Sequence, residues 1–271
     1  VNCPYAKGHY DRVNYAVFSL LQKEDMITRE VILEQAKEYN VCPFEMCLDT
    51  ATWVDDIICD YNYVFDPNVY LKRFFADGTT GDYIFLVDEA HNLVERSREM
   101  YSAIIYKEDF LLAKKILKKC GQAKLMRELE KCNRVLLSYK RDCEKYVIYE
   151  SIGNFAFELM NVASDLDEFL QKAPEFPERK DLSEFYLNLR NFLNIYELLD
   201  DHYVVYAEHE QDGRFKLKLY CVDPSKNLQE RINKGNATIF FSATLLPVGY
   251  YKSLLSTETD NYAVYAKTAF R

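Results

Sequence analysis

An apolar run at residues 83–87 stops abruptly at Asp88 and Glu89, and His91 follows two residues later. A near-continuous apolar run of this kind is typical of a parallel strand that is buried on both faces. In open α/β sheets the chemistry lies at the carboxyl ends of the strands. The run therefore predicts an α/β fold and marks these three polar residues as candidates for a site at a strand end.

A second apolar run, at residues 238–242, ends in small hydroxyl residues that include Ser242 and Thr244. The long stretch between the two runs has mainly helical periodicity from residue 107 to 200, followed by an alternating pattern around Asp212-Gly213 that predicts a β-hairpin. The order of elements therefore predicts a helical insertion of about a hundred residues between two strands of one sheet.

The composition indicates a globular protein with a substantial core. The chain has 271 residues, of which 49% are hydrophobic, enough for one large or two ordinary domains. Its apolar stretches fall well short of the roughly 20 residues that span a bilayer. Eight irregularly spaced cysteines favour a reducing, cytoplasmic location over a disulfide framework. The chain begins without Met and without a signal peptide, from which we expect a fragment of a longer protein.

The charge is unevenly distributed along the chain. The net charge is −9, which argues against a globally basic nucleic-acid-binding protein. Residues 107–145 nevertheless hold twelve basic and six acidic residues, a net charge of +6, whereas residues 150–200 carry −7. Two readings stay open, solvated helical faces or a basic track along a phosphate backbone. The candidates for such a track are Lys114, Lys115, Lys118 and Lys119.

An apolar strand that ends in Asp-Glu is the Walker B arrangement of nucleoside triphosphatases. In that arrangement the aspartate holds Mg²⁺, usually through water, and the glutamate polarises the attacking water. Asp88 and Glu89 have the required order. The alternative is that these acids cap a helix that starts at Asn92, because acidic residues favour helix N-termini.

Five segments occur in the order typical of one family: "CPYAKGHYDR", "VCPFE", "CDYNYVFDP", "VDEAHNL" and "SATLLP". Together they resemble the iron-sulfur DEAH helicases of superfamily 2, the DinG and XPD group, and most closely the DinG-like helicases. The resemblance spans nearly the whole chain, with specific motifs at both ends and a helical middle that matches in position and length.

The resemblance implies a partial RecA-like parallel sheet, a large helical Arch insertion and a truncated iron-sulfur region. Residues 1–52 are then the C-terminal part of the iron-sulfur region, and residues 53–100 are the DEAH segment of motor domain 1. Residues 101–201 resemble the Arch domain, and residues 202–271 return to motor domain 1 with the hairpin and motif III.

The resemblance also implies a 4Fe-4S cluster, with Cys3 and Cys42 at two of its four ligand positions and the other two upstream of Val1. Because two thiolates cannot hold such a cluster, we expect it in the full-length protein and not in this fragment. Cys47 is a possible substitute ligand, although free cysteines more often behave as small buried hydrophobes. A zinc site is a weaker alternative, because no CxxC spacing occurs.

Site roles follow from the same resemblance. Asp88 resembles the Mg²⁺-holding residue, Glu89 the catalytic base, and His91 the residue that couples the nucleotide site to motif III through Ser242 and Thr244. Tyr61, Asn62 and Tyr63 resemble a segment near the DNA path, where aromatic rings can stack on bases. For these tyrosines, ordinary core packing is the alternative.

The chain departs from the family pattern in its motor. None of the eight glycines is followed by lysine, so the phosphate-binding loop, motif I, is absent. Motifs IV to VI and the second motor domain are absent as well. The final segment "AKTAF" resembles the "SPF" segment that closes the first motor domain.

Three functions remain open from the sequence. The favoured one is an ATP-dependent DNA helicase that moves 5′ to 3′ on single-stranded DNA, in repair or replication. The second is a non-catalytic module that binds DNA and docks a protein partner at the Arch. The third is a DNA-dependent ATPase linked to a nuclease. The substrate structure, the pathway and the oligomeric state do not follow from the sequence.

The resemblance makes one geometric prediction. Residues 238–242 should pair in parallel with residues 83–87, because the motif II and motif III strands are neighbours in RecA-like sheets. The hydroxyl of Ser242 or Thr244 should then lie about 3 Å from Asp88 or His91.

Overall fold

The computed structural model describes residues 3–76 and 78–266. The chain divides into two compact units, Val1–Cys59 and Asp60–Arg271. The division therefore falls after Cys59, beyond the predicted boundary at residue 52. The "AKTAF" segment begins at Ala266, and its remaining residues lie outside the described part of the chain.

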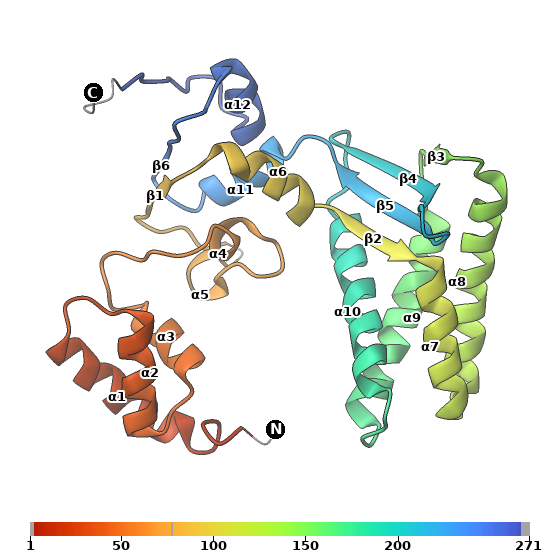
Figure 1. Cartoon of the computed structure of the whole chain (residues 1–271), viewed down its shortest axis with the longest axis horizontal. Coiled ribbons are helices and arrows are strands. Elements are labelled where there is room, and N and C mark those ends of the chain that lie inside the picture. Colours follow the sequence, from red (N-terminus) through yellow and green to blue (C-terminus); the bar gives the residue numbers. More distant parts are fainter. Residues whose placement is uncertain (1–2, 77, 267–271) are drawn as a thin grey trace. The chain divides into compact units, whose positions relative to one another are not determined.

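The first unit is a small helical body. Its described helices are α1 (His9–Lys23), α2 (Arg29–Tyr39) and α3 (Pro43–Thr50) (Figure 1). The Thr28 side chain caps helix α2 by accepting a hydrogen bond from the Val31 amide. Val17, Leu20, Ile32 and Met46 form part of its buried core.

The segment that joins the two units is irregular. The short apolar run at residues 57–59 forms no strand, and Ile58 is fully exposed. An apolar run without a neighbouring strand cannot satisfy its backbone groups by sheet pairing. The second unit then opens with two single helical turns, α4 (Asn62–Phe65) and α5 (Lys72–Phe75).

A parallel pair of strands organises the first part of the second unit. Strand β1 (Ile84–Val87) pairs with β6 (Ala237–Phe240), with Leu86 opposite Ile239. The predicted parallel pairing is therefore confirmed, although β6 starts one residue before the predicted segment and ends two residues before its end. Gly235 permits the close approach, because a Cβ at this position would lie 2.8 Å from the Tyr83 carbonyl oxygen.

Only one face of this strand pair is covered in the described residues. Phe85 and Val87 pack with α6 (His91–Met100), α11 (Ser225–Ile232) and α12 (Val248–Leu255). The opposite face carries Ile84, Leu86 and Ile239, which are 65%, 66% and 54% exposed. Burial on both faces, as the apolar run predicts, is therefore wrong for this chain, because the described helices form a layer on one side only.

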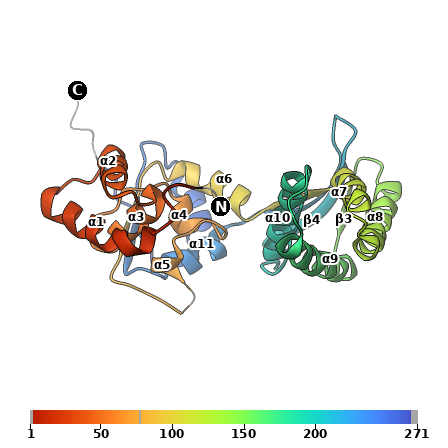
Figure 2. The same ribbon diagram turned by 90° about the horizontal axis from the view of Figure 1, so that it is seen from below.

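The insertion contains a sheet that the sequence did not predict. Its helices are α7 (Lys107–Lys119), α8 (Ala123–Asp142), α9 (Gly153–Lys172) and α10 (Arg179–Tyr196). Its strands are β2 (Ala103–Tyr106), β3 (Tyr146–Tyr149), β4 (Tyr203–His209) and β5 (Phe215–Cys221). They form an antiparallel sheet in the order β2-β5-β4-β3, and the four helices pack on one side of it (Figures 1 and 2).

The predicted hairpin is confirmed as β4 and β5, but it does not return to the parallel pair. It pairs with β2 and β3 instead, and Phe215, Leu217 and Leu219 share one core with the four helices. The predicted boundary between residues 201 and 202 therefore separates strands that belong to one sheet. The reason is that β2 and β3 offer partner edges on both sides of the hairpin, whereas the parallel pair forms a separate two-stranded sheet.

Ion pairs engage many basic residues of α7 and α8. Two of these pairs, Lys114–Glu130 and Lys140–Glu108, lie within the basic stretch, whereas three link it to the acidic stretch, which are Lys119–Glu178, Lys124–Asp165 and Lys131–Glu158. For most of the basic stretch, these contacts favour solvated, ion-paired helical faces over a basic track along a phosphate backbone.

Glu128 on α8 makes the stability of the insertion depend on pH. Burial raises the pKa of its carboxyl, and the neighbouring Asp165 carboxylate raises it further. A raised pKa means that the folded state prefers the protonated acid, so the stabilisation is present below the usual value of 4.5 and is lost as pH rises through the folded-state pKa. We expect Glu128→Gln to raise the melting temperature at neutral pH, and to do so less at acidic pH.

Thermal unfolding followed by circular dichroism across pH measures this effect. Glu144→Gln, at an exposed position beyond the end of α8, serves as the control and should change little. An equal effect of Glu128→Gln at all pH values would contradict the assignment.

Candidate active site

The candidate site begins at the turn between β1 and α6. The Asp88 Oδ1 atom accepts a hydrogen bond of 2.7 Å from the Glu89 amide. Glu89 adopts a left-handed backbone with φ of 46°, which is uncommon for a residue with a side chain. The Ala90 amide then donates to the Phe241 carbonyl oxygen at 3.2 Å, which fastens the turn to the end of the neighbouring strand.

The acids of this turn do not cap the following helix. Helix α6 begins at His91 with Ala90 as its N-cap residue, and no side chain caps it. The helix-cap alternative for Asp88 and Glu89 therefore finds no support. Both side chains are exposed at the carboxyl end of β1.

Ser242 is the centre of a small hydrogen-bond network. Its Oγ atom lies 2.8 Å from His91 Nδ1, 3.2 Å from Glu89 Oε2 and 3.4 Å from Thr244 Oγ1. His91 Nδ1 also lies 3.1 Å from Glu89 Oε2. The structure thus brings together four of the five predicted catalytic residues, and the predicted contact between Ser242 and His91 is confirmed.

One set of proton positions satisfies the whole network. The Thr244 amide donates to Ser242 Oγ at 3.2 Å, and the Ser242 hydroxyl donates to Glu89 Oε2. His91 Nδ1 then carries a proton, because it contacts only acceptors. The Glu89 carboxylate is therefore held by two donors on one oxygen, which fixes its position without neutralising it.

The chemistry of the donor set fits a hydrated divalent cation. Asp88 offers a carboxylate whose Oδ2 atom accepts no hydrogen bond from the described residues, and Mg²⁺ prefers such oxygen ligands while retaining several waters. Glu89 lies beside it with one oxygen unengaged by described donors. A fixed carboxylate next to a cation-binding carboxylate can polarise a water molecule.

The network predicts a local effect for Ser242→Ala. Removing the hydroxyl takes away the acceptor of the Thr244 amide and one donor to Glu89, and a neutral hydrogen bond contributes about 1 kcal/mol. We expect faster hydrogen exchange at the Thr244 amide with little change in global stability. Amide exchange measured by mass spectrometry or NMR tests this.

Ser253→Ala is the matched control, because the Ser253 hydroxyl donates only to the Tyr250 carbonyl oxygen at the surface. Unchanged exchange at Thr244 in Ser242→Ala would show that the network does not order the segment after β6.

The proposed DNA-contacting residues lie at α4, outside this network. Tyr61 packs against the core around β1, which favours the packing alternative for this ring. At the start of α4, the Asn62 backbone amide donates a hydrogen bond to Asp60 Oδ1 at 2.9 Å. The Tyr63 carbonyl oxygen accepts a hydrogen bond from the Leu71 amide. All three residues are half-buried.

The four candidate lysines lie on α7 and differ in their contacts. Lys114 pairs with Glu130 at 2.6 Å, and Lys119 pairs with Glu178 at 2.5 Å. Lys115 and Lys118 are exposed and pair with none of the described carboxylates. The structure therefore leaves two of the four available for a phosphate backbone.

The two predicted cluster ligands do not form a recognisable cluster site. Cys3 is exposed and Cys42 is half-buried before α3, where the Cys42 amide donates to His9 Nδ1 at 3.2 Å. Among the described residues, no group of three cysteine, histidine or acidic side chains gathers around either thiol. Cys47 is exposed, and none of the eight cysteines forms a disulfide in the described structure. The residues present do not fit a complete 4Fe-4S cluster.

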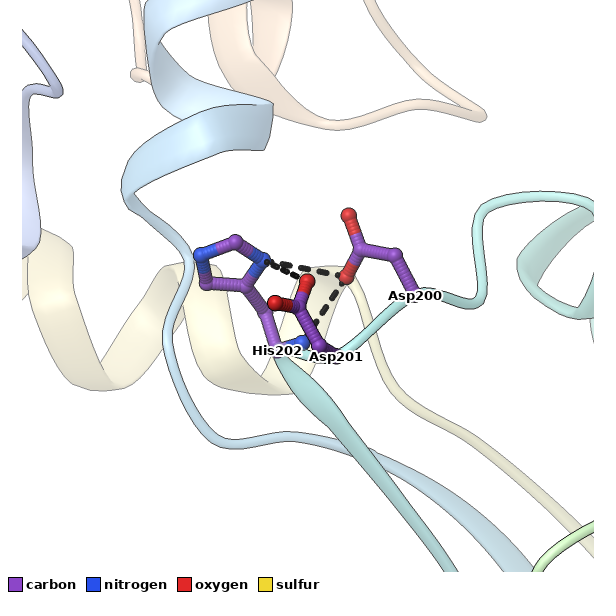
Figure 3. A group of neighbouring side chains, drawn as sticks. All are labelled: Asp200, Asp201 and His202. Atoms are coloured by element: carbon purple, nitrogen blue, oxygen red, sulfur yellow. Dashed lines mark hydrogen bonds and ion pairs between the residues drawn. The ribbon is translucent and has the colours of Figure 1, made fainter.

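A compact acidic group that the sequence analysis did not single out lies at the junction between α10 and β4. His202 Nδ1 lies 3.1 Å from Asp200 Oδ1 and 3.2 Å from Asp201 Oδ1 (Figure 3). Lys226 of α11 pairs with the other oxygen of Asp200 at 2.6 Å. Because the Lys226 ammonium already neutralises Asp200, we interpret this group as a structural contact that stabilises the junction between α10 and β4. Three consecutive polar residues between a helix and a strand were its only sequence signal.

No helix among the described residues is long and apolar enough to cross a membrane.

Comparisons with known proteins bear on the first part of the chain. Residues 1–110 match the DEAD_2 family, which is helicase-related. The Regulator of telomere elongation helicase 1 homolog of Anopheles gambiae is 26% identical over 103 residues, which make up 38% of this chain and 10% of that protein. The chain thus matches about a tenth of the relative's length. Both matches support a relationship between this segment, with its DEAH turn, and the helicases of superfamily 2.

Proposed function

We propose that this chain is part of an ATP-dependent DNA helicase of superfamily 2. One observation carries the proposal, which is the convergence of Glu89, His91 and Ser242 at the carboxyl ends of two paired parallel strands. Asp88 would hold Mg²⁺ through water, and Glu89 would polarise the water that attacks the terminal phosphate of ATP.

His91, Ser242 and Thr244 form the link between the two strand ends in this proposal. A change in charge or position at Glu89 alters the hydrogen bonds that reach Ser242, and through them the segment that follows β6. Single-stranded DNA is the proposed polymer substrate, with 5′ to 3′ movement as in the DinG-like helicases. DNA repair or replication in a reducing compartment is the corresponding role.

Strand displacement by the whole protein tests the proposal. We expect single-stranded DNA to stimulate ATP hydrolysis, and a duplex with a 5′ single-stranded tail to be unwound in preference to one with a 3′ tail. Hydrolysis that DNA does not stimulate would contradict a helicase role. Stimulated hydrolysis without displacement of either duplex would favour the translocating ATPase linked to a nuclease.

The proposal includes a 4Fe-4S cluster whose remaining ligands come from outside these 271 residues. Soft, charged thiolates suit iron, and a cluster normally takes four of them. We expect the isolated chain to carry no intact cluster and the whole protein to carry about four irons. Iron analysis and visible absorption measure this, with Cys42→Ser in the whole protein as the test of that ligand.

A brown isolated chain with cluster-like absorption would contradict the first expectation. Full iron content in the Cys42→Ser protein would remove Cys42 from the ligand set. Cys59→Ser, on the irregular segment between the two units, is the control that should leave the iron content unchanged.

A second candidate function, docking of a protein partner at the insertion, is favoured by a different observation. The helices that the structure describes lie on one side of the antiparallel sheet of the insertion, and its other side is lined by aromatic and aliphatic side chains.

A further inference from the structure

The four-stranded sheet of the insertion has two unlike faces. On the helix side, Ile105, Ala207 and Leu217 are at most 4% exposed. Side chains alternate along each strand, so the intervening residues point to the opposite face. None of the described helices packs on that face, which we call the open face. Its members are Ile104, Tyr106, Tyr146, Ile148, Val204, Tyr206, Glu208, Lys216, Lys218 and Tyr220.

The strand register arranges these side chains in rows across the sheet. One row runs through Ile104, Lys218, Tyr206 and Ile148, because Lys218 lies opposite both Ile104 and Tyr206, and Tyr206 lies opposite Ile148. Side chains directly opposite each other in a sheet have Cβ atoms about 5 Å apart. A single lysine therefore lies within an aliphatic and aromatic row.

The neighbouring row contains a lysine that is already ion-paired. Lys216 is held between Glu208 at 2.6 Å and Glu210 at 2.7 Å, and its side chain is only 12% exposed. At the end of the hairpin, Arg214 pairs with Asp212 and stacks over the Tyr106 ring, with 4.1 Å from the guanidinium carbon to the ring centroid. These two cations are already engaged.

Lys218 differs from both. It forms no ion pair and no hydrogen bond with the described residues, and its ammonium lies over the Tyr220 ring at 4.7 Å. Burial, followed by repulsion from Lys216, lowers its pKa, while the Glu208, Glu210 and Glu99 carboxylates, none of which forms an ion pair with it, act in the opposite direction. A partly desolvated ammonium without a directly paired carboxylate is unfavourable, and an added anion at this position would offset the cost.

The composition around Lys218 resembles the centre of a protein interface. Aromatic residues are enriched and charged residues are depleted at such centres, with a polar rim around them. Tyr206, Tyr220 and Ile148 supply the apolar surroundings, and Ile148 is 63% exposed. The charged residues Glu208, Glu210 and Asp212 lie to one side.

We propose that the open face docks an extended protein segment that places one carboxylate on Lys218 and apolar or aromatic side chains on Tyr206, Tyr220 and Ile148. Charge complementarity selects a protein over a nucleic acid. A phosphate backbone would meet one free cation and the acids of the neighbouring row, whereas nucleic-acid affinity depends on several phosphate contacts. This docking surface rests on the second candidate function proposed above, and it is independent of the Asp88 and Glu89 site.

A displayed library of random peptides of about 10 residues, long enough to cross the sheet, tests the proposal with the whole chain as the target. We expect selected peptides to contain Asp or Glu flanked by apolar residues. Their affinity should fall at least about tenfold with Lys218→Gln, because a partly buried charge pair loses one partner. Lys218→Arg should retain most of the binding.

Lys180→Gln is the matched control, since it removes the same charge from an exposed lysine of α10, and it should leave binding unchanged. Three results would overturn the proposal. These are a library that yields no binder, binders that tolerate Lys218→Gln, and a thymidine oligonucleotide whose binding, but not that of the peptides, depends on Lys218. Circular dichroism of each variant shows that the fold is retained.

Discussion

Replacing Glu89 with glutamine in the whole protein is expected to lower the rate of ATP hydrolysis by at least about a hundredfold. Glutamine keeps the shape of the side chain and can still accept the Ser242 hydrogen bond, but it cannot take up charge or polarise a water molecule as a carboxylate does. Nucleotide binding should be retained, because the proposed Mg²⁺ ligand is Asp88. Steady-state phosphate release, together with equilibrium binding of a fluorescent nucleotide, separates the two effects.

Glu99→Gln provides the control, since this exposed residue of α6, the helix that follows the Glu89 turn, pairs with Arg96. It should leave turnover unchanged. Normal turnover in the Glu89→Gln protein would remove Glu89 from the reaction. The isolated 271-residue chain contains no phosphate-binding loop and is expected not to turn over ATP. Turnover by that chain, abolished by Glu89→Gln, would show that another segment binds the phosphates.

The second large effect concerns Leu217, which is fully buried on β5 within the core that the helices of the insertion share. Leu217→Ala is expected to destabilise the insertion by about 2–5 kcal/mol, through the lost transfer of buried methylene groups and the remaining cavity. Because hairpin and helices share one core, α9 and β4 should lose protection from hydrogen exchange together. Urea unfolding and exchange followed by mass spectrometry measure this.

Leu112→Ala on α7 is the control, because this leucine is 51% exposed and a surface substitution usually changes stability by less than about 0.5 kcal/mol. If the hairpin lost protection while α9 kept it, the hairpin would be an independent element, closer to the arrangement that the sequence predicts.

The sequence predicts the elements whose signal is local and long. The apolar runs before Asp88 and Ser242 identify both strands of the parallel pair, and their polar endings place His91 beside Ser242. The long helices of the insertion follow from periodicity. The sequence does not show that one face of the parallel pair is uncovered. Hydrophobicity indicates that a residue favours burial, but it does not show whether a helix packs over that residue.

Short strands are missed for a different reason. The four residues of β3, Tyr146–Tyr149, directly follow a helical pattern and are too few to show a period of their own. They become a strand because β4 offers an edge more than fifty positions along the chain. The ion pairs of α7 are equally non-local, since counts of charge do not show that Glu178 reaches Lys119.

At position 89, the left-handed backbone makes the requirement of fold stability differ from the requirement of the proposed hydrolysis. A residue with a Cβ at such a φ costs about 1 kcal/mol, and glycine would adopt the same backbone without that cost. Glycine would also remove the carboxylate that His91 and Ser242 hold. Selection for thermal stability alone would therefore favour Gly at position 89, whereas selection for hydrolysis would favour Glu. Within this proposal, the turn retains a residue that weakens the fold because the reaction requires it there.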